Sequence, residues 1–236
     1  MTRIDRTARS CHAALLLALL SSATSCRAPA TPTLAPRVAN ATPWWQGAVF
    51  YETFVRSFAD ADGDGIGDLR GLTAKIDYLN DGRTGGVDLG VDALWLMPIN
   101  PSPSYHGYDV TDYRGVNPQY GTLADFEALV SAAHARGVRI ILDFVVNHTS
   151  IEHPWFRAAR ADVTSPYRDY YLWSPTPLDW TRPWDKATVW HAANGSYYYG
   201  LFGGIMPDLN LRNPHVEAEI LDILRTWLAR GVDGFR

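Results

Sequence analysis

Cysteine is scarce in this sequence. Cys11 and Cys26 are the only two among 236 residues, and both lie near the N-terminus. The residues after Cys26 therefore form no disulfide, which excludes a disulfide-stapled secreted scaffold. An excess of basic residues is also missing, because 21 Lys and Arg stand against 25 Asp and Glu. The resulting net charge of −4 argues against nucleic acid as a partner.

A long hydrophobic run is missing as well. The uncharged stretch 10–26 has 17 residues, nearly half of them polar or small, so no membrane span is expected there. Three arginines within the first nine residues precede the apolar run 13–20. This layout predicts that residues 1–26 are a secretory signal peptide and that the protein is exported.

Cys26 follows small polar residues, which resembles a bacterial lipoprotein signal in which this cysteine is lipidated. A plain cleaved signal is the alternative. Residues 27–43 are rich in Pro, Ala and Thr and are expected to be a flexible linker. The protein is therefore expected in the periplasm or at the cell surface as a lipoprotein with a lipid anchor to the membrane, or as a secreted protein.

The rest of the chain alternates between strand and helix patterns. Apolar runs predict strands, and apolar residues at helical spacing predict helices, one of them with Thr122 as its N-cap. The stretch 148–206 between them looks irregular. The expected strands are 48–55, 91–99, 138–146 and 232–235, and the expected helices are 69–79, 122–137 and one that starts at Asn213 or Pro214.

This alternation is typical of an α/β fold with a parallel sheet, either doubly wound or a (β/α)₈ barrel. No glycine-rich phosphate fingerprint follows the first strand, which argues against dinucleotide binding. Polar residues instead follow the strands, at the end where barrel active sites lie. They are Arg56, Asp60, Asn100, Asn147, His148 and Arg236.

An acidic loop over residues 60–68 places carboxylates at alternate positions between glycines. Such oxygen ligands suit a hard cation, so we expect structural Ca²⁺ here, with a solvated acidic turn as the alternative. Gly71 stands where an EF-hand would have its bidentate glutamate, which argues against a calcium sensor. The expected ligands are Asp60, Asp62, Asp64, Ile66 and Asp68.

Two further segments carry polar groups. The run 105–113 is rich in tyrosine and could stack on a sugar ring while it hydrogen-bonds the hydroxyl groups. Asp143 lies among apolar residues on the third expected strand, and a buried carboxylate needs a partner. Arg236, at the end of the fourth strand, is the expected partner.

Together these segments resemble the α-amylase family of glycoside hydrolases (family 13), over about residues 44–236. DFVVNH (143–148) and GVDGFR (231–236) resemble two of its conserved regions. MPDLN (206–210) and YHGYD (105–109) are similar to a bacterial subfamily between oligo-1,6-glucosidases and neopullulanases.

The resemblance implies a (β/α)₈ TIM barrel, truncated here after the fourth strand, with domain B inserted after strand three. Residues 44–147 would form the first half of the barrel, 148–206 domain B, and 207–236 the continuation of the barrel. Domain B would hold 12 aromatic residues between Trp155 and Tyr199. Most of these are expected to form a small core, and one or two to contact sugar.

The resemblance also implies residue roles. Tyr108 would stack under the sugar at the cleavage subsite, with His106 nearby, and His148 would bind that sugar's 6-hydroxyl. Arg236 would keep the nucleophile ionised, and Asp143 would anchor Arg236. The nucleophilic Asp and the acid Glu would lie beyond the C-terminus, so residues 1–236 alone are expected to be inactive.

A second Ca²⁺ at the junction of barrel and domain B is implied for Asn147 and Asp208. The implied reaction is retaining hydrolysis of α-1,4-glucosidic bonds in starch and maltooligosaccharides. Tyr105 and His106 stand before the glycine of YHGYD, as in endo-acting amylases, where exo-acting glucosidases usually have Asp and Asn.

Other functions stay open at this point. Within the family they are an oligo-1,6-glucosidase, a cyclomaltodextrinase or neopullulanase, and a trehalose synthase or related isomerase. A non-enzyme alternative is a catalytically dead, amylase-like binding protein associated with a transporter, and another is a truncated protein with an interaction role. The α-glucan itself is the expected partner, and the oligomeric state is not readable from the sequence.

Overall fold

The computed structural model describes residues 42–236. The predicted signal peptide, the lipidation of Cys26 and all but the last two residues of the linker lie outside the described residues. Within the described range, every helix is too short or too polar to cross a membrane.

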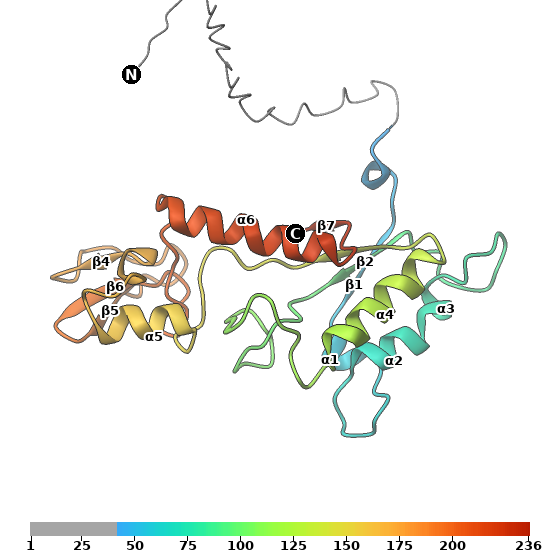
Figure 1. The fold of residues 1–236 in the computed structure, drawn as a ribbon, viewed down its shortest axis with the longest axis horizontal. Coiled ribbons are helices and arrows are strands. Elements are labelled where there is room, and N and C mark those ends of the chain that lie inside the picture. The colour runs from blue at the N-terminus through green and yellow to red at the C-terminus, as the bar shows by residue number, and fades with distance from the viewer. Residues whose placement is uncertain (1–41) are drawn as a thin grey trace, which may run out of the picture. The chain divides into compact units, whose positions relative to one another are not determined.

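The first half of the described chain alternates strands and helices, and the second half adds a separate small antiparallel sheet before the last long helix (Figure 1). The elements are η1 (Trp44–Gln46), β1 (Phe50–Thr53), α1 (Val55–Phe58), α2 (Leu69–Ala74), α3 (Ile76–Leu79), β2 (Ala93–Leu96), α4 (Leu123–His134), β3 (Arg139–Leu142), α5 (Pro154–Ala161), η2 (Arg168–Tyr170), β4 (Trp173–Ser174), β5 (Trp190–Ala193), β6 (Ser196–Tyr199), α6 (Pro214–Ala229) and β7 (Gly234–Phe235).

A four-stranded parallel sheet has the order β1-β2-β3-β7. All four strands lie within the predicted ranges, and their parallel arrangement confirms the predicted α/β class. Each strand is shorter than predicted. β3 ends at Leu142 because residues 143–148 leave the sheet and line a cavity instead. The carboxyl ends of the strands therefore lead directly into a candidate site.

The longer helices beside this sheet were predicted with one error, and the one-turn helix α1 was not predicted. α4 begins after Thr122 with a capping box, in which Thr122 and Asp125 satisfy each other's backbone N–H groups. The single helix predicted over 69–79 is two helices, α2 and α3, which break at Lys75. Its apolar stripe stays buried across the break, so the spacing identified the buried face but not the interruption.

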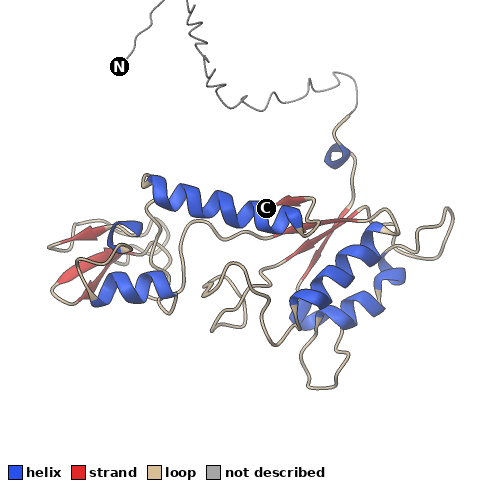
Figure 2. Cartoon of the chain, viewed as in Figure 1, coloured by secondary structure: helices blue, strands red, loops and turns tan. Residues whose placement is uncertain are grey.

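α6 joins two hydrophobic cores. Asn213 caps its N-terminus by accepting from the His215 N–H at 2.9 Å. Near the other end of the helix, Ile223 and Trp227 belong to the core between the sheet, α2 and α4. Val216, three turns away, belongs to a second core in the preceding segment. The strands of that segment are separate from the parallel sheet (Figure 2).

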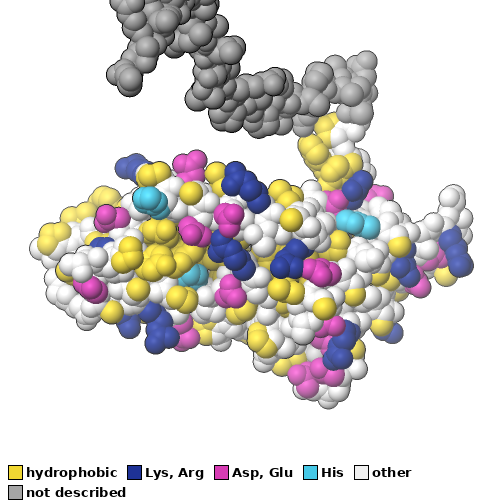
Figure 3. All heavy atoms as spheres, in the orientation of Figure 1, with side chains coloured by type: hydrophobic (Ala, Val, Ile, Leu, Met, Phe, Trp, Pro, Cys, Tyr) yellow, Lys and Arg dark blue, Asp and Glu magenta, His cyan; other side chains and the backbone are white. Residues whose placement is uncertain are grey.

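The segment predicted as irregular, 148–206, contains α5, η2 and an antiparallel sheet of order β4-β6-β5. The prediction was wrong because these strands are only two to four residues long, too short for a periodic pattern. Aromatic rings form much of the local core, where Phe156 packs against Tyr171, Trp173 and Tyr198. Figure 3 shows hydrophobic side chains gathered on the visible face of this part of the chain.

Candidate active-site pocket

A cavity of about 660 Å³ lies where β2, β3 and β7 end. Its wall is mainly apolar, with a few charged and polar groups. This combination is typical of a site for a small polar ligand with apolar faces. The lining residues are His106, Tyr108, Asp143, Phe144, Val145, Val146, Asn147, His148, Phe202, Met206 and Arg236.

Asp143 is the buried centre of the polar groups, with 4% of its surface exposed. The Arg236 Nη1 donates to its Oδ1 at 2.9 Å, so the ion pair expected from the sequence is present. The Tyr108 hydroxyl donates to its Oδ2 at 2.6 Å, a bond that the sequence did not predict. Burial, followed by the bond to this carboxylate, raises the pKa of Tyr108 to about 12, so the phenol stays protonated. Asp143 thus fixes two cavity side chains at once.

Arg236 presents the rest of its guanidinium outward. Its side chain is 55% exposed, and its Cζ lies 5.1 Å from the centre of the Trp95 ring. The bond to Asp143 raises the pKa of Arg236 further, so the cation persists at any relevant pH. The guanidinium has five N–H groups, and the free ones can bind a second carboxylate or a sugar oxygen.

Both ring nitrogens of His148 have protein partners. The Nε2 lies 3.2 Å from the Tyr108 carbonyl, which can only accept, so this nitrogen carries the proton. The Asn147 amide then donates to Nδ1 at 3.3 Å. Burial lowers the pKa of His148, which keeps the ring neutral. A bond from His148 to a sugar hydroxyl would therefore compete with the Tyr108 carbonyl.

The loop that carries Tyr108 is held from inside. The Nδ1 of His106 accepts from the Tyr108 backbone N–H at 3.1 Å and lies 3.0 Å from the Ser104 hydroxyl. Asp109, only 2% exposed, accepts from the hydroxyls of Ser104 and Ser102. This network fixes the position of the Tyr108 ring before any ligand binds.

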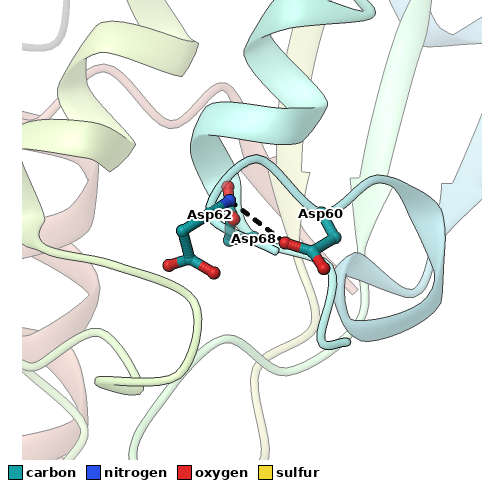
Figure 4. A group of neighbouring side chains, drawn as sticks. All are labelled: Asp60, Asp62 and Asp68. Carbon is teal, nitrogen blue, oxygen red and sulfur yellow. Dashed lines mark hydrogen bonds between the residues drawn. The ribbon is translucent and has the colours of Figure 1, made fainter. Parts of the chain in front are cut away.

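The acidic loop brings three carboxylates together (Figure 4). One oxygen from each of Asp60, Asp62 and Asp68 lies within 4.8 Å of the others. Backbone N–H groups, that of Gly63 above all, lower the pKa of Asp60, so this carboxylate stays charged. Asp64 is outside the group, and its carboxylate accepts from the Ile66 N–H at 2.7 Å. Three hard oxygen donors fit Ca²⁺ or Mg²⁺.

The loop also has internal partners for these charges. Asp68 is the N-cap of α2, because it accepts from the Gly71 N–H at 2.7 Å. Arg70 forms an ion pair with Asp62 at 3.1 Å. The loop geometry therefore permits a cation but does not depend on one.

Asn147 and Asp208, the two residues expected to bind a second Ca²⁺, lie side by side. The Asn147 amide donates to Asp208 Oδ2 at 2.9 Å, and the Leu201 N–H donates to the other carboxylate oxygen at 2.9 Å. Burial raises the pKa of Asp208. Asp208 is the only carboxylate of this pair, whereas the acidic loop brings three together.

Two residues at strand ends do not reach the cavity. Arg56 donates to Gln119 at 2.7 Å, and Asn100 donates to the carbonyls of Tyr113 and Gly115. Sequence reasoning missed Phe202 and Met206 as cavity residues. Met206 is the first residue of the MPDLN motif and Phe202 lies four residues before it, which was the available signal.

The chain was compared with family models and with curated proteins. The family model described as "Alpha amylase, catalytic domain" matches residues 52–236. Alpha-amylase 3 of Dictyoglomus thermophilum is 52% identical over 194 residues, which cover 82% of this chain and 36% of that protein. An oligo-1,6-glucosidase of Parageobacillus thermoglucosidasius is 44% identical over 200 residues, 82% of this chain and 34% of that protein. The chain thus spans about a third of the length of these curated relatives.

Solved structures match in the same region. An alpha-amylase from H. orenii has a TM-score of 0.77 and is 55% identical to this chain. The aligned region covers 80% of this chain and 39% of the H. orenii chain. The R284C mutant of the trehalulose synthase MutB has a TM-score of 0.75 and 42% identity, with 83% and 35% covered.

Proposed function

Because this chain belongs to the α-amylase family of glycoside hydrolases, we propose that the complete gene product hydrolyses α-1,4-glucosidic bonds of starch and maltooligosaccharides. The four parallel strands and their helices correspond to part of the family's (β/α)₈ barrel. The observation that carries the proposal is the Tyr108–Asp143–Arg236 network in the cavity at the carboxyl ends of these strands.

The proposed chemistry is a retaining double displacement. One carboxylate attacks the anomeric carbon, and a second carboxyl group protonates the leaving oxygen. No residue in 1–236 matches the family's nucleophile or acid. Glu52 and Asp112 are acidic, but they do not line the cavity. The described residues therefore bind and orient the sugar and set the charge around the nucleophile.

Three polar cavity residues contact the sugar or the nucleophile in this proposal. The Tyr108 ring, fixed by Asp143 and by His106, stacks against the sugar at the cleavage subsite. The free N–H groups of Arg236 hold the nucleophilic carboxylate ionised, because a nearby cation favours the charged form. In the absence of ligand, the Nε2–H of neutral His148 donates to the Tyr108 carbonyl. When sugar binds, this N–H donates to the sugar's 6-hydroxyl instead.

The choice of α-1,4 over α-1,6 bonds is supported by Tyr105 and His106 before Gly107. The test compares cleavage of maltoheptaose with cleavage of isomaltose and panose by the complete gene product. Faster cleavage of maltoheptaose is the expected result. A preference for isomaltose would instead favour the oligo-1,6-glucosidase alternative, and formation of trehalose from maltose would favour a trehalose synthase.

We also propose that the acidic loop binds structural Ca²⁺ through Asp60, Asp62 and Asp68. A cation held only by the folded loop, at about a hundredfold its Kd, is expected to stabilise the protein by about 2.7 kcal/mol. The measurement is urea unfolding of the complete gene product with Ca²⁺ or with a chelator. Asp62→Asn should remove most of the difference, whereas Asp179→Asn, in an exposed loop elsewhere, should keep it. Equal Ca²⁺ stabilisation of wild type and Asp62→Asn would refute this site.

Finally, we propose that the protein is exported and anchored by a lipid on Cys26. The support is the sequence pattern of residues 1–26, with a basic start, an apolar run and a cysteine after small residues. Expressed in bacteria, the wild-type protein should fractionate with membranes, and Cys26→Ala should move it to the soluble fraction. A wild-type protein found free outside the cell would support a plain signal peptide instead.

A further inference from the structure

Two exposed aromatic rings lie beside the cavity. The rings of Trp184 and Phe202 are stacked, with centroids 5.8 Å apart and planes 25° apart. Trp184 is 55% exposed and Phe202 is 48% exposed. Phe202 also lines the cavity, and its ring centroid is 5.3 Å from that of His148. Aromatic surface therefore continues from the cavity wall at His148 outward through what we call the Trp184–Phe202 platform.

The loop that carries Trp184 is held in place. An antiparallel bridge between Thr181 and Thr188 closes its base. The Arg182 guanidinium lies over the Trp184 ring, 5.7 Å from its centroid, and donates to the Phe202 carbonyl at 3.4 Å. Arg182 thus connects the two halves of the platform. A ring held in this way loses little conformational entropy when a ligand stacks on it.

The chemistry of the platform suits a carbohydrate. Large apolar rings left in water favour contact with a ligand that has an apolar face, and sugar rings offer C–H faces with hydroxyl groups around the edge. Charged groups for those hydroxyls are at hand, because Arg182 and Asp185 form an ion pair at 2.8 Å next to Trp184. An exposed ring elsewhere lacks this setting: Trp45, 50% exposed, lies in η1 and does not line the cavity.

We propose that the Trp184–Phe202 platform binds the glucose units of an α-glucan that extend out of the cavity, and so selects for longer chains. This inference rests on the proposed function, since it takes the ligand of the cavity to be an α-glucan. Because Phe202 belongs to both the cavity wall and the platform, a single glucan chain can contact both.

The test uses the complete gene product and its Trp184→Ala variant, with Trp45→Ala as the control for loss of an equally exposed tryptophan. We measure kcat/KM for maltooligosaccharides from maltotriose to maltoheptaose and, by calorimetry, the Kd for a maltoheptaose whose glycosidic oxygens are replaced by sulfur so that it is not cleaved. One aromatic stacking contact corresponds to a loss of about twofold to tenfold in affinity. Trp184→Ala should therefore lose about this factor on maltoheptaose and progressively less on shorter chains. Trp184→Phe should recover most of it.

The outcomes separate the two proposals. A loss for Trp184→Ala that is the same for all chain lengths, or that is matched by Trp45→Ala, overturns the platform while the proposed function stands. A wild-type protein that cleaves no α-glucoside overturns the proposed function, and the maltoheptaose Kd still tests the platform directly. Thermal melts of all variants exclude misfolding, and a platform variant with unchanged Kd refutes the inference.

Discussion

Asp143→Ala is expected to lower kcat/KM of the complete gene product on maltoheptaose by about 100-fold or more. The reason is that Asp143 holds both Arg236 and Tyr108 through its two carboxylate oxygens. Without it, the guanidinium and the phenol lose their common anchor, and a misplacement of ~1 Å at a reacting centre costs about 100-fold in rate. The fall should appear mainly in kcat, because the transition state depends most on the orientation of Arg236.

The control is Asp77→Ala. Asp77 also forms an ion pair, with Arg136, but its side chain is 67% exposed and lies outside the cavity. Exposed ion pairs contribute about 0–1 kcal/mol to stability, so this variant should keep both activity and fold. Asp143→Asn should retain the acceptor for one partner and fall between wild type and Asp143→Ala. Wild-type activity in Asp143→Ala would show that the network does not position the reacting groups.

Trp227→Ala is expected to destabilise the protein by about 3–5 kcal/mol, the range for removal of a large buried aromatic side chain. Trp227 is 1% exposed and packs edge-on against Phe126 of α4, with ring centroids 5.2 Å apart. Its indole N–H donates to the Tyr113 carbonyl at 2.8 Å. The substitution therefore leaves a cavity and removes one of the two hydrogen bonds that the Tyr113 carbonyl accepts, the other coming from the Asn100 amide.

The effect should also reach the candidate site, because the Tyr113 hydroxyl donates to the His148 carbonyl at 2.7 Å. Urea unfolding measures the free energy of unfolding. Leu228→Ala is the matched control, since Leu228 is the next residue of α6 and is 50% exposed. That variant should lie within about 0.5 kcal/mol of wild type. A similar loss in both variants would mean that α6 does not pack as described.

The sequence predicted the parts of the fold that have strong periodic patterns. Nearly continuous apolar runs gave the parallel strands, and the polar residue Thr122 before an amphipathic run gave the start of α4. The break at Lys75 was not predictable, because the apolar spacing continues through it. The antiparallel sheet β4-β6-β5 was missed since strands of two to four residues carry too few alternations to recognise.

The part of the candidate site that could be predicted is the ion pair of Asp143, because a buried carboxylate needs a partner of opposite charge. Asp143 among apolar residues, with Arg236 at the end of the neighbouring strand, led to the observed ion pair. The Tyr108–Asp143 bond was not foreseen, since these residues are 35 positions apart and their meeting depends on the course of the loop after β2. Phe202 was missed because it is one of many aromatic residues in this segment, and only its position four residues before the MPDLN motif distinguishes it.

The measurement that tests the central claim most directly is proton NMR of the complete gene product acting on maltoheptaose, followed from the first minutes. A retaining α-glucan hydrolase, the function proposed for the cavity at the carboxyl ends of the strands, keeps the configuration of the bond that it cleaves. The newly formed reducing ends should therefore first appear as the α-anomer and then equilibrate with the β-anomer. Initial release of the β-anomer, or intact maltoheptaose after prolonged incubation with folded protein, would contradict the proposed function.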